Sequence, residues 1–291
     1  MKKPVWRDVE VAAGQWPQVA KEYGLSDLQI KMLDGRHNTP HIIEGKASLV
    51  MKFLVPARVH DKITTNWLNV YMDAEQIITF HAPSLDVISI LRDRVEIHTT
   101  LGSLPSGVLA LIADVVTEQF TPILDYIDDV TDLLVDKVAQ HPREEQLQQL
   151  FDFKQLLSGI RRIVLPMMML LDGLQNGRYE LVDTEYATTY LRDSYTYIWR
   201  VHELIDTTRD LLNSALDVYL SVVSNRMSEI MKRLTIVATI FMPLSFLVGF
   251  GGMNFTRQIH FDDDILFAGI VVLIVGTPIM MIMYFKRRGW M

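Results

Sequence analysis

Apolar residues are concentrated in two segments near the C-terminal end of the chain. Residues 234–250 and 265–285 contain no charged side chain, whereas roughly the first 230 residues mix polar and apolar positions as soluble proteins do. At about 1.5 Å per residue, the two segments cover about 25 Å and about 31 Å, against a bilayer core of about 30 Å. No helix stop signal separates the shorter segment from residues 228–233, so the helix can continue below the bilayer core. The pattern predicts two membrane-spanning helices.

Basic residues flank both apolar segments. Lys232 and Arg233 precede the first segment, and residues 286–288 read Lys-Arg-Arg after the second. Basic flanks are retained in the cytoplasm. We therefore expect a multi-pass protein of the cell inner (plasma) membrane, with both termini cytoplasmic and residues 251–264 outside. The alternative is that both segments are buried core helices, which would not explain the matching basic flanks.

A helical pattern leads into the first span from about residue 183, and its first internal proline is Pro243. A continuous helix of this length reaches about 100 Å, far beyond the usual helix of a globular protein. It carries a mostly apolar seam spaced by three and four residues, as in a coiled coil. The seam comprises Leu191, Tyr195, Ile198, His202, Ile205, Arg209, Leu212, Leu216, Tyr219, Val223, Arg226 and Ile230. We interpret the segment as a stalk helix that carries the first span.

A second stripe with the same spacing is polar below the membrane and small or flexible within it. It comprises Asp217, Ser221, Ser224, Ser228, Met231, Leu234, Ala238, Met242, Ser245 and Gly249. Several copies of such a helix around an axis could line a pore, with the apolar stretch as its gate. The alternative is that the serines simply face solvent.

The N-terminal part has the pattern of an α/β domain. β-Branched and aromatic residues near turn formers predict strands over 48–55, 67–71 and 76–80, and suggest another over 94–99. Helical periodicity predicts helices over 106–138 and 142–175, the second with Pro142 in its first turn. The expected organisation is a cytosolic α/β domain (1–100), an antiparallel long-helix pair (101–176), a stalk helix (177–233), a first span (234–250), an external loop (251–264), a second span (265–285) and a cytosolic tail (286–291).

Composition and motifs narrow the classes of function that the chain can have. The net charge of −7 disfavours nucleic acid as a partner and is compatible with cations. The absence of cysteine excludes disulfides, thiolate metal sites and cysteine nucleophiles. No nucleophile and base arrangement stands out, and no glycine-rich phosphate loop is present, so we expect no enzyme and no tightly bound cofactor.

Residues 232–255, KRLTIVATIFMPLSFLVGFGGMNF, resemble the pore helix and signature of the CorA metal ion transporter family. Its hallmark is the tripeptide Gly252-Met253-Asn254, placed between two C-terminal spans. Residues 200–233 and 161–166 are also similar to the family. The resemblance implies a funnel-shaped homopentamer that conducts divalent cations, most often Mg²⁺, along a central pore. It assigns pore positions to Asn254, Gly249, Ser245, Met242, Leu234, Met231 and Asp217, and those from Asp217 to Gly249 fall on the stripe drawn from spacing.

The chemistry of this signature suits Mg²⁺ as the transported ion. We also expect Mg²⁺ as a possible regulator. Mg²⁺ holds its water tightly, and a ring of neutral Asn254 carbonyls can accept hydrogen bonds from that water shell. The loop departs from the family where Gly251 precedes the tripeptide and Thr256 and Arg257 follow it. Selectivity among Mg²⁺, Co²⁺, Ni²⁺ and Zn²⁺ stays open. A Zn²⁺ transporter of the same family and a non-conducting membrane-anchored scaffold or sensor are the alternatives.

Three acidic features have two interpretations each. Asp262, Asp263 and Asp264 either attract cations at the loop or cap the second span. Asp193 either matches a regulatory metal ligand between subunits, as the resemblance implies, or is a solvated stalk residue. Four aspartates spaced i, i+3, i+4 and i+7 either collect divalent ions or form a solvated helix face, namely Asp125, Asp128, Asp129 and Asp132.

Overall fold

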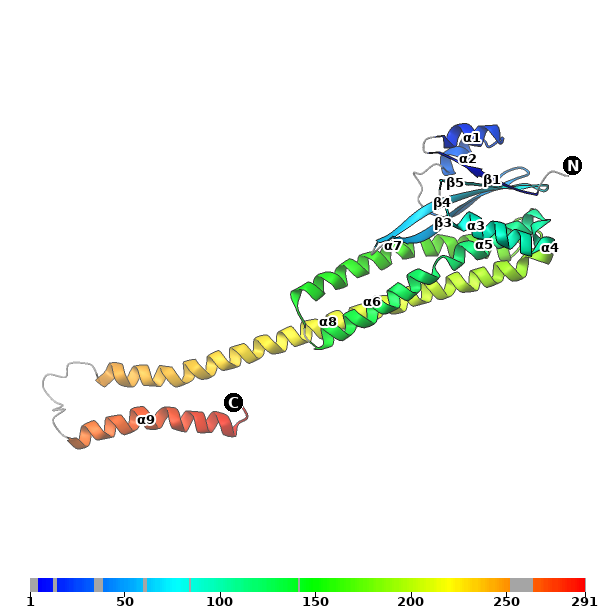
Figure 1. Ribbon diagram of the computed structural model, residues 1–291. Coiled ribbons are helices and arrows are strands. Elements are labelled where there is room, and N and C mark those ends of the chain that lie inside the picture. The colour runs from blue at the N-terminus through cyan, green and yellow to red at the C-terminus, as the bar shows by residue number, and fades with distance from the viewer. Residues whose placement is uncertain are drawn as a thin grey trace. The chain divides into compact units, whose positions relative to one another are not determined.

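The computed structural model describes residues 5–12, 15–33, 39–59, 62–83, 85–140, 142–251 and 264–290. The chain packs as two units, Met1–Leu216 and Asp217–Met291. Figure 1 shows the elements of each unit. The finer domain boundaries expected from the sequence stay predictions.

The first unit is built on a five-stranded mixed sheet of order β1-β5-β4-β3-β2. β1 pairs with β5 in parallel, and all other neighbours are antiparallel. The bounds are β1 Trp6–Glu10, β2 His41–Glu44, β3 Leu49–Val59, β4 Lys62–Met72 and β5 Ile77–His81. The strands expected over 48–55, 67–71 and 76–80 are therefore confirmed, as β3, β4 and β5.

Helices cover both faces of the sheet (Figure 1). On one face, α1 (Trp16–Glu22) and α2 (Asp27–Leu33) bury Trp16, Ala20 and Leu33 against Val50 and Phe80. On the other face lies α5 (Pro105–Glu118), which is buried along almost its whole length. An 18-residue window within Pro105–Gln140 is apolar enough to resemble a membrane span, but 67 % of that window is buried within the protein. This window is core, because its apolar side chains are already covered by the unit itself.

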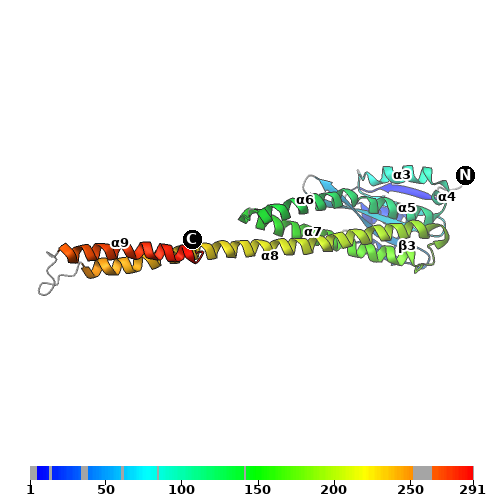
Figure 2. The same ribbon diagram turned by 90° about the horizontal axis from the view of Figure 1, so that it is seen from below.

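Three expectations for this unit are corrected. The segment 94–99 is no strand: α3 (Val87–Ile97) occupies most of it, followed by the short α4 (Thr99–Gly102). The single helix expected over 106–138 is interrupted after Glu118, and α6 (Thr121–Gln140) follows it. Pro142 precedes the first turn of α7 (Glu144–Gln175), whose N-cap is Arg143. The short connection makes α6 and α7 an antiparallel hairpin, as both views show (Figures 1 and 2).

The stalk helix predicted from the sequence is present as α8 (Thr184–Gly251), 68 residues in one continuous helix. In its first part, Leu191, Ile198, Ile205 and Leu212 of the apolar seam are fully buried. Later seam positions, such as Ile230, are exposed in the single chain. The seam is therefore a core element of the first unit as far as Leu212.

The second unit pairs the rest of α8 with α9 (Asp264–Arg287), which contains the second predicted span. The two lie side by side in both views (Figures 1 and 2). Lys232 Nζ donates a hydrogen bond of 3.2 Å to the Gly289 carbonyl. Ile236 and Phe285 are buried. The contact places both basic flanks at the same end of this helix pair, and the orientation of the pair in the membrane stays a prediction.

Candidate ion pathway

The membrane part of α8 satisfies its own polar groups. Thr235 Oγ1 donates to the Met231 carbonyl at 2.8 Å, and Thr239 Oγ1 donates to the Thr235 carbonyl at 2.7 Å. Hydroxyl groups bonded within one helix avoid the cost of unpaired polar groups in lipid. Only 6 % of the apolar window in Ala187–Phe250 is buried, in contrast to the window in α5 and α6. α8 therefore has the composition and the exposed surface of a membrane helix.

The predicted pore stripe lies on uncovered surface of α8. All ten of its positions are exposed in the single chain: Asp217, Ser221, Ser224, Ser228, Met231, Leu234, Ala238, Met242, Ser245 and Gly249. Nothing lies within 4 Å of a Cβ built on Gly249. Much of α8 beyond Leu216 is also exposed, so exposure alone does not distinguish the stripe from its neighbours. It does leave the stripe free to face other copies of the helix.

One part of the stripe borders α9. Leu234, Ala238 and Met242 line an open groove of about 420 Å³, together with Met281 of α9. Thr235, Thr239 and Pro243 complete its lining. The apolar part of the stripe is therefore at the edge of the α8 and α9 pair, whereas Ile236 is covered.

The predicted pore mouth lies outside the described residues. This applies to Gly252, Met253 and Asn254, and also to Asp262 and Asp263. Asp264 is the first residue of α9, and its backbone alone is described. The roles assigned to these six residues stay predictions.

Asp193 lies on α8 near a group of charged side chains that the sequence did not connect with it. Arg94 of α3 bonds Asp114 at 2.9 Å and Glu118 at 2.8 Å, both on α5. Burial raises the pKa of Asp114, and the charge of Glu118 raises it further. Arg94 opposes this rise, and Asp193 adds to it. Asp193 therefore acts electrostatically on a half-buried carboxyl of α5.

Within the described part of one chain, no three His, Cys, Asp or Glu side chains are arranged to hold a metal ion. The carboxylates near Asp193 are partly neutralised by Arg94. A metal bound at Asp193 would need further ligands from water or from another subunit. The regulatory role of Asp193 stays a prediction.

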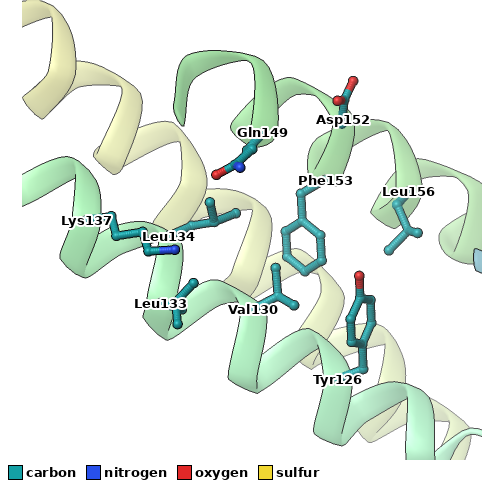
Figure 3. Close-up of a pocket in the computed structure, with 9 residues that line it drawn as sticks. All are labelled: Tyr126, Val130, Leu133, Leu134, Lys137, Gln149, Asp152, Phe153 and Leu156. Atoms are coloured by element: carbon teal, nitrogen blue, oxygen red, sulfur yellow. The ribbon is translucent and has the colours of Figure 1, made fainter. Parts of the chain in front are cut away.

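The four aspartates of α6 are exposed, at positions 125, 128, 129 and 132. A groove of about 330 Å³ separates α6 from α7, and Figure 3 shows its lining. The Phe153 ring points across it toward Tyr126, with ring centroids 6.3 Å apart in an edge-on arrangement. Asp152 is the carboxylate that lines this groove, and none of the four aspartates does so. The four form an acidic helix face with no matching cavity among the described residues.

Comparison with known proteins identifies the family to which the chain is similar. The model of the CorA-like Mg²⁺ transporter protein family matches residues 2–287. The cobalt/magnesium transport protein CorA of Thermotoga maritima is 26 % identical over 94 % of this chain and 79 % of its own length. The complete structure of the CorA magnesium transporter from Methanocaldococcus jannaschii aligns with a TM-score of 0.84 at 22 % identity, covering 98 % of this chain and 91 % of that one.

The cytoplasmic domain of ZntB from Vibrio parahaemolyticus also has this fold. It aligns with a TM-score of 0.62 at 12 % identity, covering 77 % of this chain and 89 % of that one. Likeness at this identity concerns the fold and not the transported ion. The family match spans both units, and the family comprises transporters and not enzymes. The chain therefore belongs to the CorA-like Mg²⁺ transporter family, whose members carry divalent cations across membranes.

Proposed function

We propose that the chain forms a homopentameric channel that admits Mg²⁺ down its electrochemical gradient. The observation that carries this proposal is the exposed stripe along α8, which runs from Asp217 to Gly249 and leads to the Gly252-Met253-Asn254 loop. Five copies of α8 around an axis would turn the stripe inward and form a continuous path. An ion of charge +2 gains about 4.6 kcal/mol on entering an interior at −100 mV, so no ATP is required.

The outer mouth of this channel is a ring of Asn254 side chains. Neutral amide oxygens accept hydrogen bonds from hydrated Mg²⁺ without holding the ion too tightly to release it. Residues Asp262, Asp263 and Asp264 raise the local cation concentration near that mouth. Mg²⁺ also acts from the cytoplasm, where Asp193 and the nearby Asp114 contribute to a regulatory site that favours the closed state.

The transported ion is tested by flux into liposomes that contain the purified protein under an inside-negative potential. We expect Mg²⁺ uptake, with Co²⁺ and Ni²⁺ as weaker substrates. Zn²⁺ uptake without Mg²⁺ uptake would favour a zinc transporter of the same family. Uptake of no divalent cation would leave a membrane-anchored scaffold or sensor and would overturn the transport proposal.

The role of the pore mouth is tested by Asn254→Ala. The matched control is Gln258→Ala, which removes another side-chain amide from the same loop. We expect Asn254→Ala to abolish Mg²⁺ uptake and to keep the oligomer intact by size-exclusion chromatography with light scattering. Gln258→Ala is expected to conduct. Mg²⁺ uptake by Asn254→Ala at the wild-type rate would refute the role of this ring.

The membrane orientation is tested by labelling introduced cysteines, because the natural sequence contains none. A thiol reagent that cannot cross the membrane should label Thr256→Cys in intact cells. It should label Trp290→Cys after the cells are opened. Labelling of both positions from outside would contradict cytoplasmic termini in the inner membrane.

A further inference from the structure

Three arginines gather where α7 packs against α8. They surround an open pocket of about 220 Å³, which is lined by Ser158, Arg161, Arg162 and Leu165 from α7 and by Arg209 from α8. The chain as a whole carries a net charge of −7. The pocket is therefore a positively charged site on a protein whose net charge is negative.

The positive charge of the pocket is only partly balanced. Among the described residues, the carboxylate that pairs with these arginines is Asp206. Its Oδ1 atom lies 3.2 Å from Arg161 Nε and 3.7 Å from Arg209 Nη1. His202 Nδ1 lies 3.5 Å from the other oxygen, Oδ2. Three guanidinium groups that share one carboxylate give these four side chains a net charge of +2.

Two shielded polar atoms of the cluster also lack a hydrogen-bond partner. Arg161 Nε and Asp206 Oδ1 are both shielded from solvent, yet neither makes a hydrogen bond in this structure. Their contact is close in distance but poor in direction, so the donor and the acceptor are both left unsatisfied. Arg161 and Arg209 are themselves only 37 % and 35 % exposed. Excess positive charge in such a half-buried place is costly unless an anion joins it.

An ordinary explanation of surface arginines is solvation, and it fits Arg162 considered alone. It does not explain why guanidinium groups from two helices border one pocket. Nor does it explain the unsatisfied donor of Arg161, which water reaches poorly.

We infer that this pocket binds a phosphate dianion, either inorganic phosphate or the terminal group of a phosphomonoester. Arginine presents a planar fork of donors that matches phosphate in bidentate fashion. A phosphomonoester carries a charge of about −1.5 to −2 at pH 7, which balances the net charge of these four side chains. The pocket is smaller than the roughly 300–1,000 Å³ of typical small-molecule sites, so it accepts the phosphate and leaves the remainder of the ligand in solvent.

This assignment does not depend on the proposed channel. A ligand held by Arg161, Arg162 and Arg209 would join α7 to α8, the helix that also carries the pore stripe. Binding at the pocket is measured without ion flux, so the failure of one proposal leaves the other standing.

The test is isothermal titration calorimetry of the full-length protein in detergent, in a low-salt buffer free of phosphate. One arm uses inorganic phosphate, and the other uses a nucleoside 5′-monophosphate, so the two sources of the same group are distinguished. We expect saturable binding in at least one arm. Arg162→Ala and Arg209→Ala should each weaken it by about tenfold or more, since a hydrogen bond to a charged group is lost.

The matched control is Arg192→Ala, which removes an exposed arginine of α8 outside the pocket. It should bind phosphate as the wild type does. Unfolding temperatures without ligand should be unchanged in Arg162→Ala, because that side chain is exposed. No saturable binding in either arm would overturn the proposal, and so would equal binding by all variants. If the wild-type oligomer binds no phosphate and the Arg162→Ala variant dissociates, the cluster serves contacts between copies of the chain. That result would also overturn the proposal.

Discussion

The pair of the buried His81 and the partly buried Asp8 joins the parallel strands β1 and β5 and predicts a measurable pH dependence. The His81 side chain is 6 % exposed and that of Asp8 is 20 % exposed, and His81 Nε2 lies 3.1 Å from Asp8 Oδ1. His81 Nδ1 lies 2.7 Å from the Ala82 carbonyl. Neutral imidazole has one N–H and the charged form has two, so both contacts are hydrogen bonds only when His81 is protonated. Burial lowers the pKa of His81, but the bonds to Asp8 and Ala82 outweigh it, and the pKa is raised overall.

The informative perturbation is Asp8→Asn. An asparagine at this position can still accept the hydrogen bond that Thr79 Oγ1 gives Asp8 at 2.8 Å, but it carries no charge for His81. A hydrogen bond to a charged group contributes about 1.5–3 kcal/mol. We therefore expect Asp8→Asn to lower the free energy of unfolding by about 2 kcal/mol near pH 6. In a unit of this size, that corresponds to a fall of about 4–8 °C in Tm.

The effect of this substitution has a definite sign with pH. Because the pKa of His81 is higher in the folded protein than its ordinary value of 6.5, the pair stabilises the fold fully below that value. The stabilisation is lost as pH rises through the raised pKa. Burial alone would raise the pKa of Asp8, yet its bonds to His81 and Thr79 hold it below the usual value, so Asp8 stays ionised over this range.

The assay is thermal unfolding of the full-length protein in detergent, followed by near-ultraviolet circular dichroism at pH 6 and pH 9. The exposed Asp93 of α3 provides the control Asp93→Asn, which should unfold as the wild type does at both values. The difference between wild type and Asp8→Asn should be smaller at pH 9. An equal or larger difference at pH 9 would refute the charged pairing of Asp8 and His81.

Three further substitutions test the packing and the acidic group near Asp193. Gly107→Ala places a Cβ 2.3 Å from the Leu101 carbonyl oxygen. We therefore expect the free energy of unfolding, measured by chemical denaturation, to fall by at least about 2 kcal/mol. Wild-type stability would contradict this close approach. Ile205→Ala removes a fully buried side chain of α8 and should cost about 2–5 kcal/mol in the same assay, whereas a cost below about 1 kcal/mol would mean that the cavity collapses. Arg94→Met leaves Asp114 and Glu118 without their cation, so added Mg²⁺ should raise the Tm of this variant more than that of wild type. An equal rise in both proteins would count against cation binding by these carboxylates.

Sequence patterns identified the elements whose signal is local. The strands β3, β4 and β5 alternate or are continuously apolar, and α8 has no proline before Pro243. The short strands β1 (WRDVE) and β2 (HIIE) were missed, because charged residues interrupt any alternation in them. The segment 94–99 was assigned to a strand, although the residues that anchor α3 in the core lie upstream, at Val87, Ile88 and Leu91.

The break between α5 and α6 had a local signal that the periodicity obscured. Pro122 follows Thr121 at the start of α6, a favoured position for proline in a first helical turn. The apolar pattern continues through the break because Phe120 is itself fully buried. Apolar periodicity alone therefore predicted one helix where the structure has two, α5 and α6.

The candidate site was predictable only where its residues follow one another along α8. The stripe from Asp217 to Gly249 is a property of one helix, so spacing was sufficient to draw it. The surroundings of Asp193 depend instead on the packing of α3, α5 and α8, which brings Arg94 and Asp114 near it. No local pattern encodes that contact. The arginine pocket was missed for the same reason, since Arg161 and Arg209 belong to different helices.

The division of the chain into Met1–Leu216 and Asp217–Met291 has a consequence for biosynthesis. The parallel pairing of β1 with β5 and the burial of Leu212 use residues of the first unit alone. At about 5–20 residues per second, a ribosome needs roughly 4–15 s to add the 75 residues of the second unit. Small mixed α/β domains usually fold within about a second or less. The first unit therefore has time to begin packing while the helices of the second unit are still being made.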